Sequence, residues 1–126
     1  NILISDNGDI IGIIDFGDMV YTFQAAEPAV AMAYIAPNND DPFPSIASML
    51  EGYHAKFPLQ QSELASTIYL MCSRLCITVS MAAWRKKLFP DNRYLTISES
   101  SAWTLLRMME EEDMGEWSSR LVEHAS

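Results

Sequence analysis

The chain has 126 residues, about the length of one domain or of part of a larger one. Apolar residues make up 49% of it and charged residues only 20%, a balance typical of a packed globule. The formal net charge is −9, and no stripe of Lys and Arg interrupts the acidic residues. Because nucleic acids and anionic membranes are bound through clustered basic residues, the composition argues against both as partners.

The spacing of the cysteines and the hydropathy of the chain indicate its cellular compartment. Cys72 and Cys76 lie in an expected helix, where a disulfide along one face has poor geometry. We therefore expect both to be small apolar core residues of a reduced, cytoplasmic protein. The segment nearest to a membrane span, residues 64–83, carries Arg74 at its centre and several Ser and Thr residues. This pattern favours a buried helix.

The first fifteen residues predict a β-hairpin. Apolar runs at residues 2–5 and 10–14 flank Asp6-Asn7-Gly8-Asp9, and Asn-Gly is a strong hairpin signal because both residues tolerate positive φ. The second run is apolar on both faces, so we expect it to be covered on both sides. Asp15 follows directly, and a carboxylate beside a buried strand needs a partner or a metal. The chain opens without Met, inside a strand pattern, so we expect it to be part of a longer protein.

Helical patterns fill the rest of the chain. Apolar residues recur at helical spacing over residues 27–36, 44–56 and 62–88, separated by prolines and turn-forming residues. The capping box Thr96-Ile97-Ser98-Glu99 predicts the start of a fourth helix, and Asp113-Met114-Gly115-Glu116 predicts the cap of a fifth. The predicted fold class is α+β, mostly α: a β-hairpin followed by about five helices, in one unit over residues 1–126.

The most specific pattern lies at the beginning of the chain. Asn1 precedes an apolar strand, a hairpin follows, and Ile14-Asp15-Phe16-Gly17-Asp18 closes it. This combination resembles the catalytic and metal loops of protein-kinase-like phosphotransferases, and more closely those of the aminoglycoside phosphotransferase and choline kinase family. The resemblance implies the C-terminal lobe of that fold, with Mg²⁺ and ATP or GTP as cofactors. Because Asp-Phe-Gly alone occurs by chance in many proteins, a plain buried hairpin is the alternative.

The resemblance also implies a role for each matching residue. In phosphoryl transfer a bound metal ion neutralises the charge that develops on the phosphate oxygens. By the resemblance, Asn1 and Asp15 would be the ligands of that Mg²⁺ ion. Gly17 would shape the loop so that Asp15 faces the phosphates, and Asp18 would support the metal from behind or through water. Glu27 stands where the family has a second acid that holds the catalytic loop. Alternatively, Glu27 only favours the dipole in the first turn of a helix.

Later residues narrow the resemblance. Gly17-Asp18-Met19-Val20, Tyr94-Leu95-Thr96-Ile97-Ser98 and Ala102-Trp103 look like the hydroxylysine kinase branch of the family. That branch implies transfer of a nucleotide γ-phosphate to a hydroxyl of a cationic amino acid, amino alcohol or aminoglycoside. The catalytic Asp belongs upstream of Asn1 and the N-terminal lobe is absent, so we expect no catalytic residue and no activity in this chain. The alternative is a non-catalytic helical interaction module, a pseudokinase remnant. The cleft left by the missing lobe would favour self-association of this chain.

Overall fold

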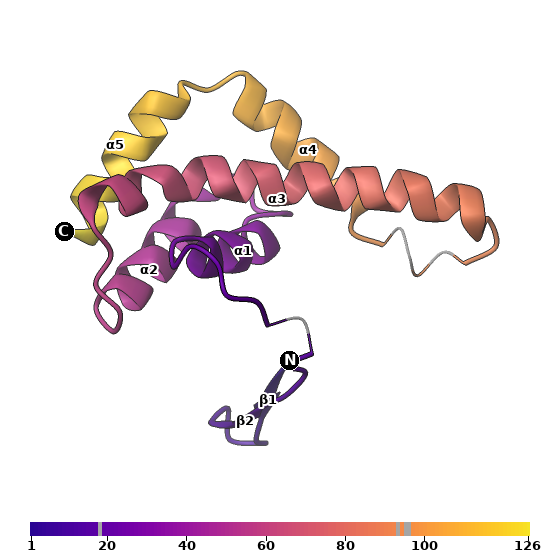
Figure 1. Cartoon of the computed structure of the whole chain (residues 1–126), viewed down its shortest axis with the longest axis horizontal. Coiled ribbons are helices and arrows are strands. Elements are labelled where there is room, and N and C mark those ends of the chain that lie inside the picture. The colour runs from indigo at the N-terminus through magenta and orange to yellow at the C-terminus, as the bar shows by residue number, and fades with distance from the viewer. Residues whose placement is uncertain (18, 93, 95–96) are drawn as a thin grey trace.

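The computed structural model describes residues 1–17, 19–92, 94 and 97–126. Within these residues the chain forms a two-stranded antiparallel hairpin and then five helices (Figure 1), which confirms the expected mostly helical α+β class. In chain order the elements are β1 Ile2–Ile4, β2 Ile10–Ile13, α1 Ala26–Ile35, α2 Phe43–His54, α3 Gln61–Leu88, α4 Glu99–Glu110 and α5 Met114–Ala125. The expected helix ranges differ from these by no more than a few residues at each end.

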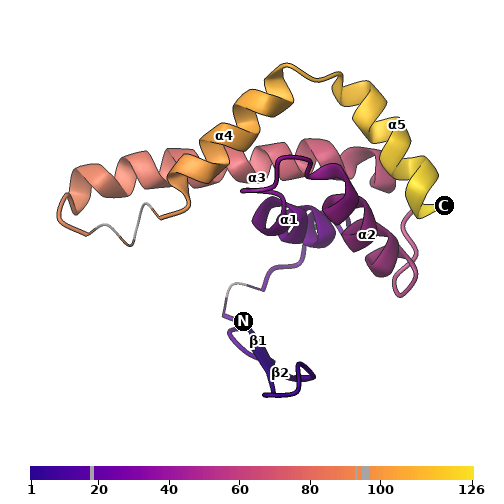
Figure 2. The ribbon, with the colours of Figure 1, turned by 180° about the vertical axis from the view of Figure 1, so that it is seen from behind.

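The long helix α3 is the centre of the helical part. Helices α1 and α2 lie on one side of it and α4 and α5 on the other, as the views from the front and from behind show (Figures 1 and 2). A hydrogen bond from Ser118 Oγ in α5 to the Ala65 carbonyl in α3 links two of these helices at 2.8 Å. The largest fully buried apolar chains come from four helices: Met32, Ile46, Leu50, Ile68, Met71, Leu75 and Leu121. This shared core fixes the relative positions of α1 to α5.

Side-chain caps mark the starts of two helices. The carboxylate of Asp113 accepts from the backbone N–H groups of Gly115 and Glu116 at 2.8 and 3.1 Å, as the sequence predicts for α5. Helix α3 begins with a capping box between Gln60 and Glu63, which the sequence does not signal because Gln is an uncommon N-cap residue. The predicted box at residues 96–99 involves Thr96, which lies outside the described residues, and α4 begins at Glu99.

The hairpin turn differs from the simplest Asn-Gly turn. The Gly8 N–H donates to the Ser5 carbonyl and the Ser5 N–H donates to the Asp9 carbonyl, both at 2.9 Å. Gly8 has φ +87°, whereas Asn7 is not in the left-handed region. This arrangement fits a three-residue loop, in which an ordinary turn is followed by a left-handed residue. Gly8 is therefore the residue whose backbone freedom the turn uses.

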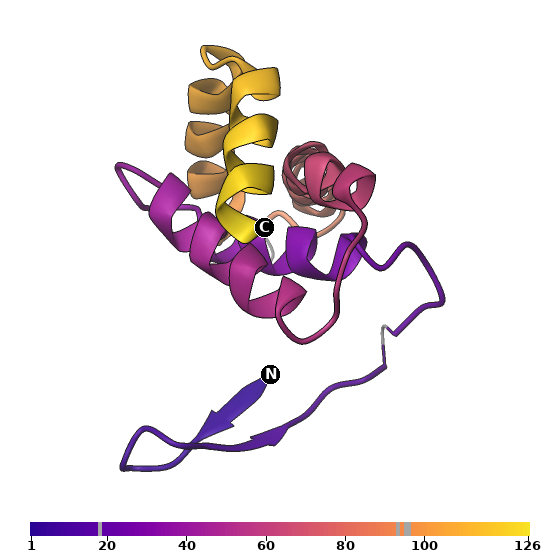
Figure 3. The same ribbon diagram turned by 90° about the vertical axis from the view of Figure 1, so that its left-hand side faces the viewer.

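The expectation that the second strand is covered on both faces is wrong for this structure. Ile10, Ile11 and Ile13 are each more than 60% exposed. The hairpin stands apart from the helices, and an irregular segment leads from it to α1, as the side view shows (Figure 3). The physical reason is that an all-apolar sequence shows only that a strand could be buried on both faces. Whether a partner covers it depends on the other elements, and the described helices pack on one another instead.

Helix α3 is long and apolar enough to cross a membrane by length and composition alone, with a mean hydropathy of 1.4 over its most apolar 18 residues. A third of that segment is buried within the protein. The buried side chains, among them Ile68, Met71 and Leu75, contact the helices on both sides of α3. The central helix of a helical core satisfies the same criteria, and the face of α3 with Ile68, Met71 and Leu75 is buried, whereas residues 83–88 are exposed.

Candidate functional site

The hairpin brings the two predicted metal ligands to neighbouring positions. The Ile14 N–H donates to the Asn1 carbonyl at 2.9 Å, so the two chain segments meet at the open end of the hairpin. Asp15 follows Ile14, and the side chains of both Asn1 and Asp15 are exposed to solvent. Amide and carboxylate oxygens are the protein ligands that Mg²⁺ prefers. The fold therefore brings two residues with suitable oxygen donors to the open end of the hairpin.

Asp15 has an unusual backbone conformation. Its φ is +67°, in the left-handed region that side chains other than Gly, Asn and Asp seldom adopt. Gly17 is outside that region, and a Cβ added to it would meet only Asp15 Oδ1, at an ordinary 3.9 Å. The sharp change of direction after β2 is thus made at Asp15 itself. Gly17 lies beside the Asp15 carboxylate, and its predicted part in shaping the loop stays a prediction.

The two acids predicted to support the metal site are placed differently. Asp18 lies outside the described residues. Glu27 is exposed in the first turn of α1, on the helical part of the molecule. Helix α1 packs on α2, where burial and then the Glu27 carboxylate raise the pKa of Tyr53. This position agrees with the first-turn alternative, and a contact of Glu27 with a catalytic loop stays a prediction.

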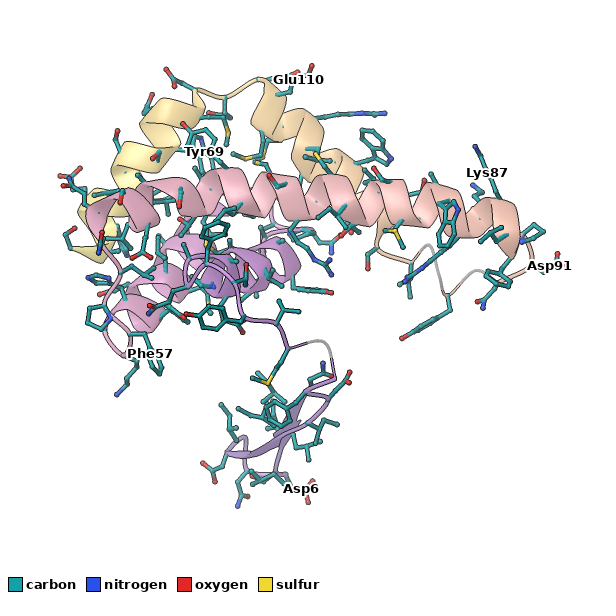
Figure 4. All side chains as sticks on the ribbon, in the orientation of Figure 1. Asp6, Phe57, Tyr69, Lys87, Asp91 and Glu110 are labelled. Carbon is teal, nitrogen blue, oxygen red and sulfur yellow. The ribbon has the colours of Figure 1, made fainter. Side chains whose placement is uncertain are left out.

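The described residues bring few potential metal ligands together. No group of three or more His, Cys, Asp and Glu side chains among them is placed to hold an ion. Asn1 and Asp15 are two donors, and Figure 4 shows the side chains of the hairpin, with Asp6 at its turn, reaching into open space. Any further ligands would therefore be nucleotide oxygens, water, or groups from outside these residues.

The two cysteines are free thiols in different surroundings. Cys72 is half-buried in α3, and burial followed by the neighbouring Cys76 raises the pKa of its thiol to about 11. Cys76 is exposed, so the expectation that both cysteines belong to the core is wrong for Cys76. The reason is the angular width of the buried stripe on α3, which includes Met71 and Leu75 but not the position after Leu75.

A second arrangement of polar groups lies between the helices and was not predicted as a site. A cavity of about 460 Å³ is bounded by α1, α3 and the beginning of α4. Arg74 of α3 lines it and donates from Nη2 to the Tyr34 hydroxyl of α1 at 2.9 Å. The signal in the sequence was an arginine at the centre of an apolar helix. It entered only the argument against a membrane span, because the sequence does not show which helix faces Arg74.

Comparison with known proteins gives a consistent result. The chain is 32% identical over 108 residues to a hydroxylysine kinase of Mus musculus, covering 85% of this chain and 28% of the relative. It is 33% identical over 101 residues to that of Bos taurus, with 79% and 27% covered. For Xenopus laevis the identity is 28% over 113 residues, with 89% and 30% covered. This chain is related to the hydroxylysine kinases.

The relation to hydroxylysine kinases extends along most of this chain but not along most of those proteins. The chain spans less than a third of the length of the curated relatives that it matches. No family model matches the chain, and no solved structure matches it. The relation to kinases that the sequence pattern indicated is thereby confirmed. Membership of the wider aminoglycoside phosphotransferase and choline kinase family, and the identity of the helical part as a kinase lobe, stay predictions.

Proposed function

We propose that this chain forms the metal-binding loop and part of the C-terminal lobe of a small-molecule kinase. The kinase transfers the γ-phosphate of ATP or GTP to a hydroxyl of a cationic amino acid, amino alcohol or aminoglycoside. The observation that carries the proposal is the hydrogen bond from the Ile14 N–H to the Asn1 carbonyl at 2.9 Å, which holds the backbone of Asn1 next to the residue that precedes Asp15. The similarity to hydroxylysine kinases supports it independently.

The chemistry assigned to the hairpin follows from its oxygen donors. Bound Mg²⁺ supplies neutralisation of the charge that builds up on the phosphate oxygens during transfer. Asp15 contributes a formal negative charge toward the ion, and Asn1 contributes a neutral amide oxygen. Asp18 is assigned a supporting role, either behind the residues that touch the metal or through a bridging water. The left-handed φ of Asp15 changes the course of the backbone shortly after β2, at the residue that carries the carboxylate.

The exposed hairpin supports the proposal that a further part of the kinase completes the site. Ile10, Ile11 and Ile13 leave large apolar side chains exposed on the hairpin, and the chain spans less than a third of the length of its relatives. In the proposed kinase an N-terminal lobe covers these residues, and a catalytic Asp upstream of Asn1 orients the attacking hydroxyl. This chain alone is then inactive. Phosphoryl transfer above background by the 126-residue chain would contradict that division.

The substrate class rests on the relatives and on charge. The relatives are named for hydroxylysine, an amino acid with a hydroxyl and a cationic side chain. The net charge of −9 favours a cationic substrate over an anionic one. We propose a cytoplasmic protein that binds nucleotide and small substrate, and neither nucleic acid nor membranes.

The test is Mg²⁺-dependent ATP and GTP binding by calorimetry, in this chain and in a longer protein with its upstream residues. Asp15→Asn removes the charge but tolerates the left-handed backbone, so it isolates the ligand role. Asp9→Asn makes the same charge change at the exposed hairpin turn and is the matched control. Binding that requires Mg²⁺, is lost in Asp15→Asn and is kept in Asp9→Asn supports the proposal. Equal binding by all three longer proteins, or none, would overturn it.

A second candidate is the non-catalytic helical module. The observation that favours it is the exposure of the apolar hairpin, in which Ile10, Ile11 and Ile13 are each more than 60% exposed. Such a module would use the exposed apolar hairpin for association, including self-association. Sedimentation of the chain with and without Ile11→Lys tests this surface. A wild-type dimer that the substitution dissociates, together with no nucleotide binding in the longer protein, would favour the module.

A further inference from the structure

The second half of α3 carries a stripe of exposed apolar side chains. Ile77, Trp84 and Leu88 are each more than half exposed, and Met81, which lies between them along the helix, is 36% exposed. This part of α3 extends beyond the helices that pack on its first half, with Lys87 close to its end (Figures 1 and 4). Because burial of apolar surface is favourable, an open stripe of this kind is suited to a partner.

The four side chains have the spacing of a coiled-coil seam. Successive members lie four, three and four residues apart, which is the alternation of apolar positions in a heptad. Over roughly three turns of helix the stripe is about 16 Å long. A second helix laid along it would bury all four side chains at once. We call Ile77, Met81, Trp84 and Leu88 the α3 seam.

The cavity between α1, α3 and α4 borders one side of the α3 seam. Ile77 and Met81 contribute to its wall, together with Tyr94 and Ile97 from the connection between α3 and α4. The side chains of Tyr94 and Ile97 are 78% and 75% exposed. The surface beside the seam is therefore both hollow and partly apolar. It offers room for a bulky apolar side chain from a docked helix, the kind of anchor that dominates binding energies at interfaces.

The charge beside the seam indicates the chemistry of the docked helix. Arg85 and Lys87 occupy the two kinds of heptad position that flank the apolar residues, one on each side. No Asp or Glu follows Glu63 in α3, although the chain has 17 acidic residues. Within the described part of the chain, no carboxylate lies within ion-pairing distance of Arg85 or Lys87. Acidic residues on the facing helix would supply the complementary charge.

A second copy of this chain does not provide such a helix. Two α3 seams placed face to face would set Arg85 and Lys87 against the same basic residues, whichever way the helices run, and like charges there repel. Acidic residues gather instead around the end of α4 and the start of α5. Helix α4 exposes one large apolar side chain, Trp103, and α5 exposes none. The complementary helix therefore comes from outside this chain.

We propose that the α3 seam is a docking site for an amphipathic helix of another protein segment, with apolar residues at its heptad positions and Glu or Asp beside them. A bulky apolar residue of that helix enters the cavity next to Ile77 and Met81, and its acidic residues pair with Arg85 and Lys87. Trp84 supplies the largest side chain of the seam. The inference goes beyond the proposed kinase function and does not depend on it, because no residue of the hairpin takes part.

The experiment measures binding of two designed peptides to the 126-residue chain by fluorescence anisotropy and calorimetry. Both peptides have about 21 residues, three heptads, with Ile and Leu at the apolar positions. The acidic peptide has Glu at the flanking positions and the basic peptide has Lys there. We expect the acidic peptide to bind about tenfold more tightly or better, and its affinity to fall as the salt concentration rises.

The apolar part of the interface is tested at Trp84. Trp84→Ala should weaken binding of the acidic peptide by about tenfold or more, because a large aromatic side chain is lost from the seam. Tyr69→Ala removes another exposed aromatic side chain of α3, at a position before the seam, and should bind the peptide as the wild type does. Equal losses in the two variants would contradict the assignment.

The charged part is tested by reversing the flanks. Arg85→Glu combined with Lys87→Glu should reverse the preference, so that the basic peptide binds more tightly than the acidic one. Lys86→Glu combined with Arg107→Glu makes the same change in net charge at exposed residues away from the flanks and should keep the acidic preference. A reversed preference requires an intact seam, so misfolding cannot imitate it.

Three results would overturn the proposal. The first is no binding of the acidic peptide, or equal binding of both peptides, by the wild-type chain. The second is a wild-type dimer in sedimentation that Trp84→Ala dissociates, which would place a second copy on the seam. The third is binding to vesicles of phosphatidylserine and phosphatidylcholine through Trp84 without binding of the acidic peptide, which would make this face a membrane contact.

Discussion

The backbone N–H of Ile14 donates to the carbonyl of Asn1 at 2.9 Å, and this bond is what makes the two ends of the hairpin a candidate site. The residues lie far enough apart in sequence that only the strand pairing brings them together. The register Ile2 to Ile13 extends the same ladder by one step. A change that weakens the ladder should therefore separate Asn1 from Asp15 without disturbing the helices, which pack independently of the hairpin.

Gly8→Ala should weaken the hairpin selectively. Gly8 has φ +87° and no atom within 4 Å of the position of an added Cβ, so the cost is backbone strain of about 1–2 kcal/mol. The population of paired strands, measured from cross-strand contacts between Ile2 and Ile13 by NMR, should fall. The thermal midpoint of the helices should not change. Gly8→Asn, which tolerates the left-handed region, is the control, and an equal loss in both variants would contradict this reading.

Ile68→Ala should destabilise the whole helical part. Ile68 is fully buried in the first half of α3, and removing its side chain leaves a cavity between helices. We expect the free energy of unfolding in urea to fall by about 2–5 kcal/mol. Ile77→Ala on the same helix, where the side chain is 52% exposed, should cost much less. Similar losses in the two variants would show that burial does not decide the cost here.

Asp113→Ala should lower stability through the start of α5. Asp113 accepts from the Gly115 and Glu116 N–H groups, and loss of an N-cap costs about 1 kcal/mol. The loss should appear as a lower urea midpoint and as faster hydrogen exchange of those two amides. Glu111→Ala removes an exposed acid just before the cap and is the control. Unchanged exchange at Gly115 and Glu116 would be the contrary result.

Cys76 should react with iodoacetamide well before Cys72. Burial, and then Cys76, raise the pKa of Cys72 from 9.0 to about 11, so at pH 8 only about one part in a thousand of Cys72 is thiolate. Alkylation of Cys72, followed by mass spectrometry in Cys76→Ser, should accelerate about tenfold per pH unit up to about pH 11. Cys72→Ser reports Cys76 alone. Faster reaction at Cys72 than at Cys76 at pH 8 would contradict the assignment.

The same pKa shift predicts how stability depends on pH. Folding raises the pKa of the Cys72 thiol, so the folded state keeps a proton that the unfolded chain loses above about pH 9. The contribution of this group is fully present below that pH and is lost as the pH rises through about 11. Urea unfolding at pH 8, 9 and 10 should therefore show a steeper decline for the wild type than for Cys72→Ser. Parallel declines would mean that the thiol titrates alike in both states.

Local signals in the sequence were enough for the elements and for the metal-loop pattern. Helical spacing predicted five helices within a few residues of their observed bounds, and the residue pattern at Asp113 predicted the N-cap of α5. Both features depend on neighbours along the chain. The run from Asn1 to Asp18 indicated a kinase relation that the hydroxylysine kinases bear out. These features depend on short-range chemistry, which a single sequence records directly.

Tertiary structure decided which apolar and polar residues have partners. The sequence predicts that the strand Ile10–Ile13 is buried, yet it is exposed. The sequence also predicts that Cys76 belongs to the core, yet it is exposed to solvent. Arg74 reads as an oddity in an apolar helix, and only its approach to Tyr34, 40 residues away in sequence, makes it part of a cavity. Hydrophobicity and charge indicate which environment a side chain prefers. The packing of distant elements determines which residues it contacts, because contacts across a core are not encoded in any short stretch of sequence.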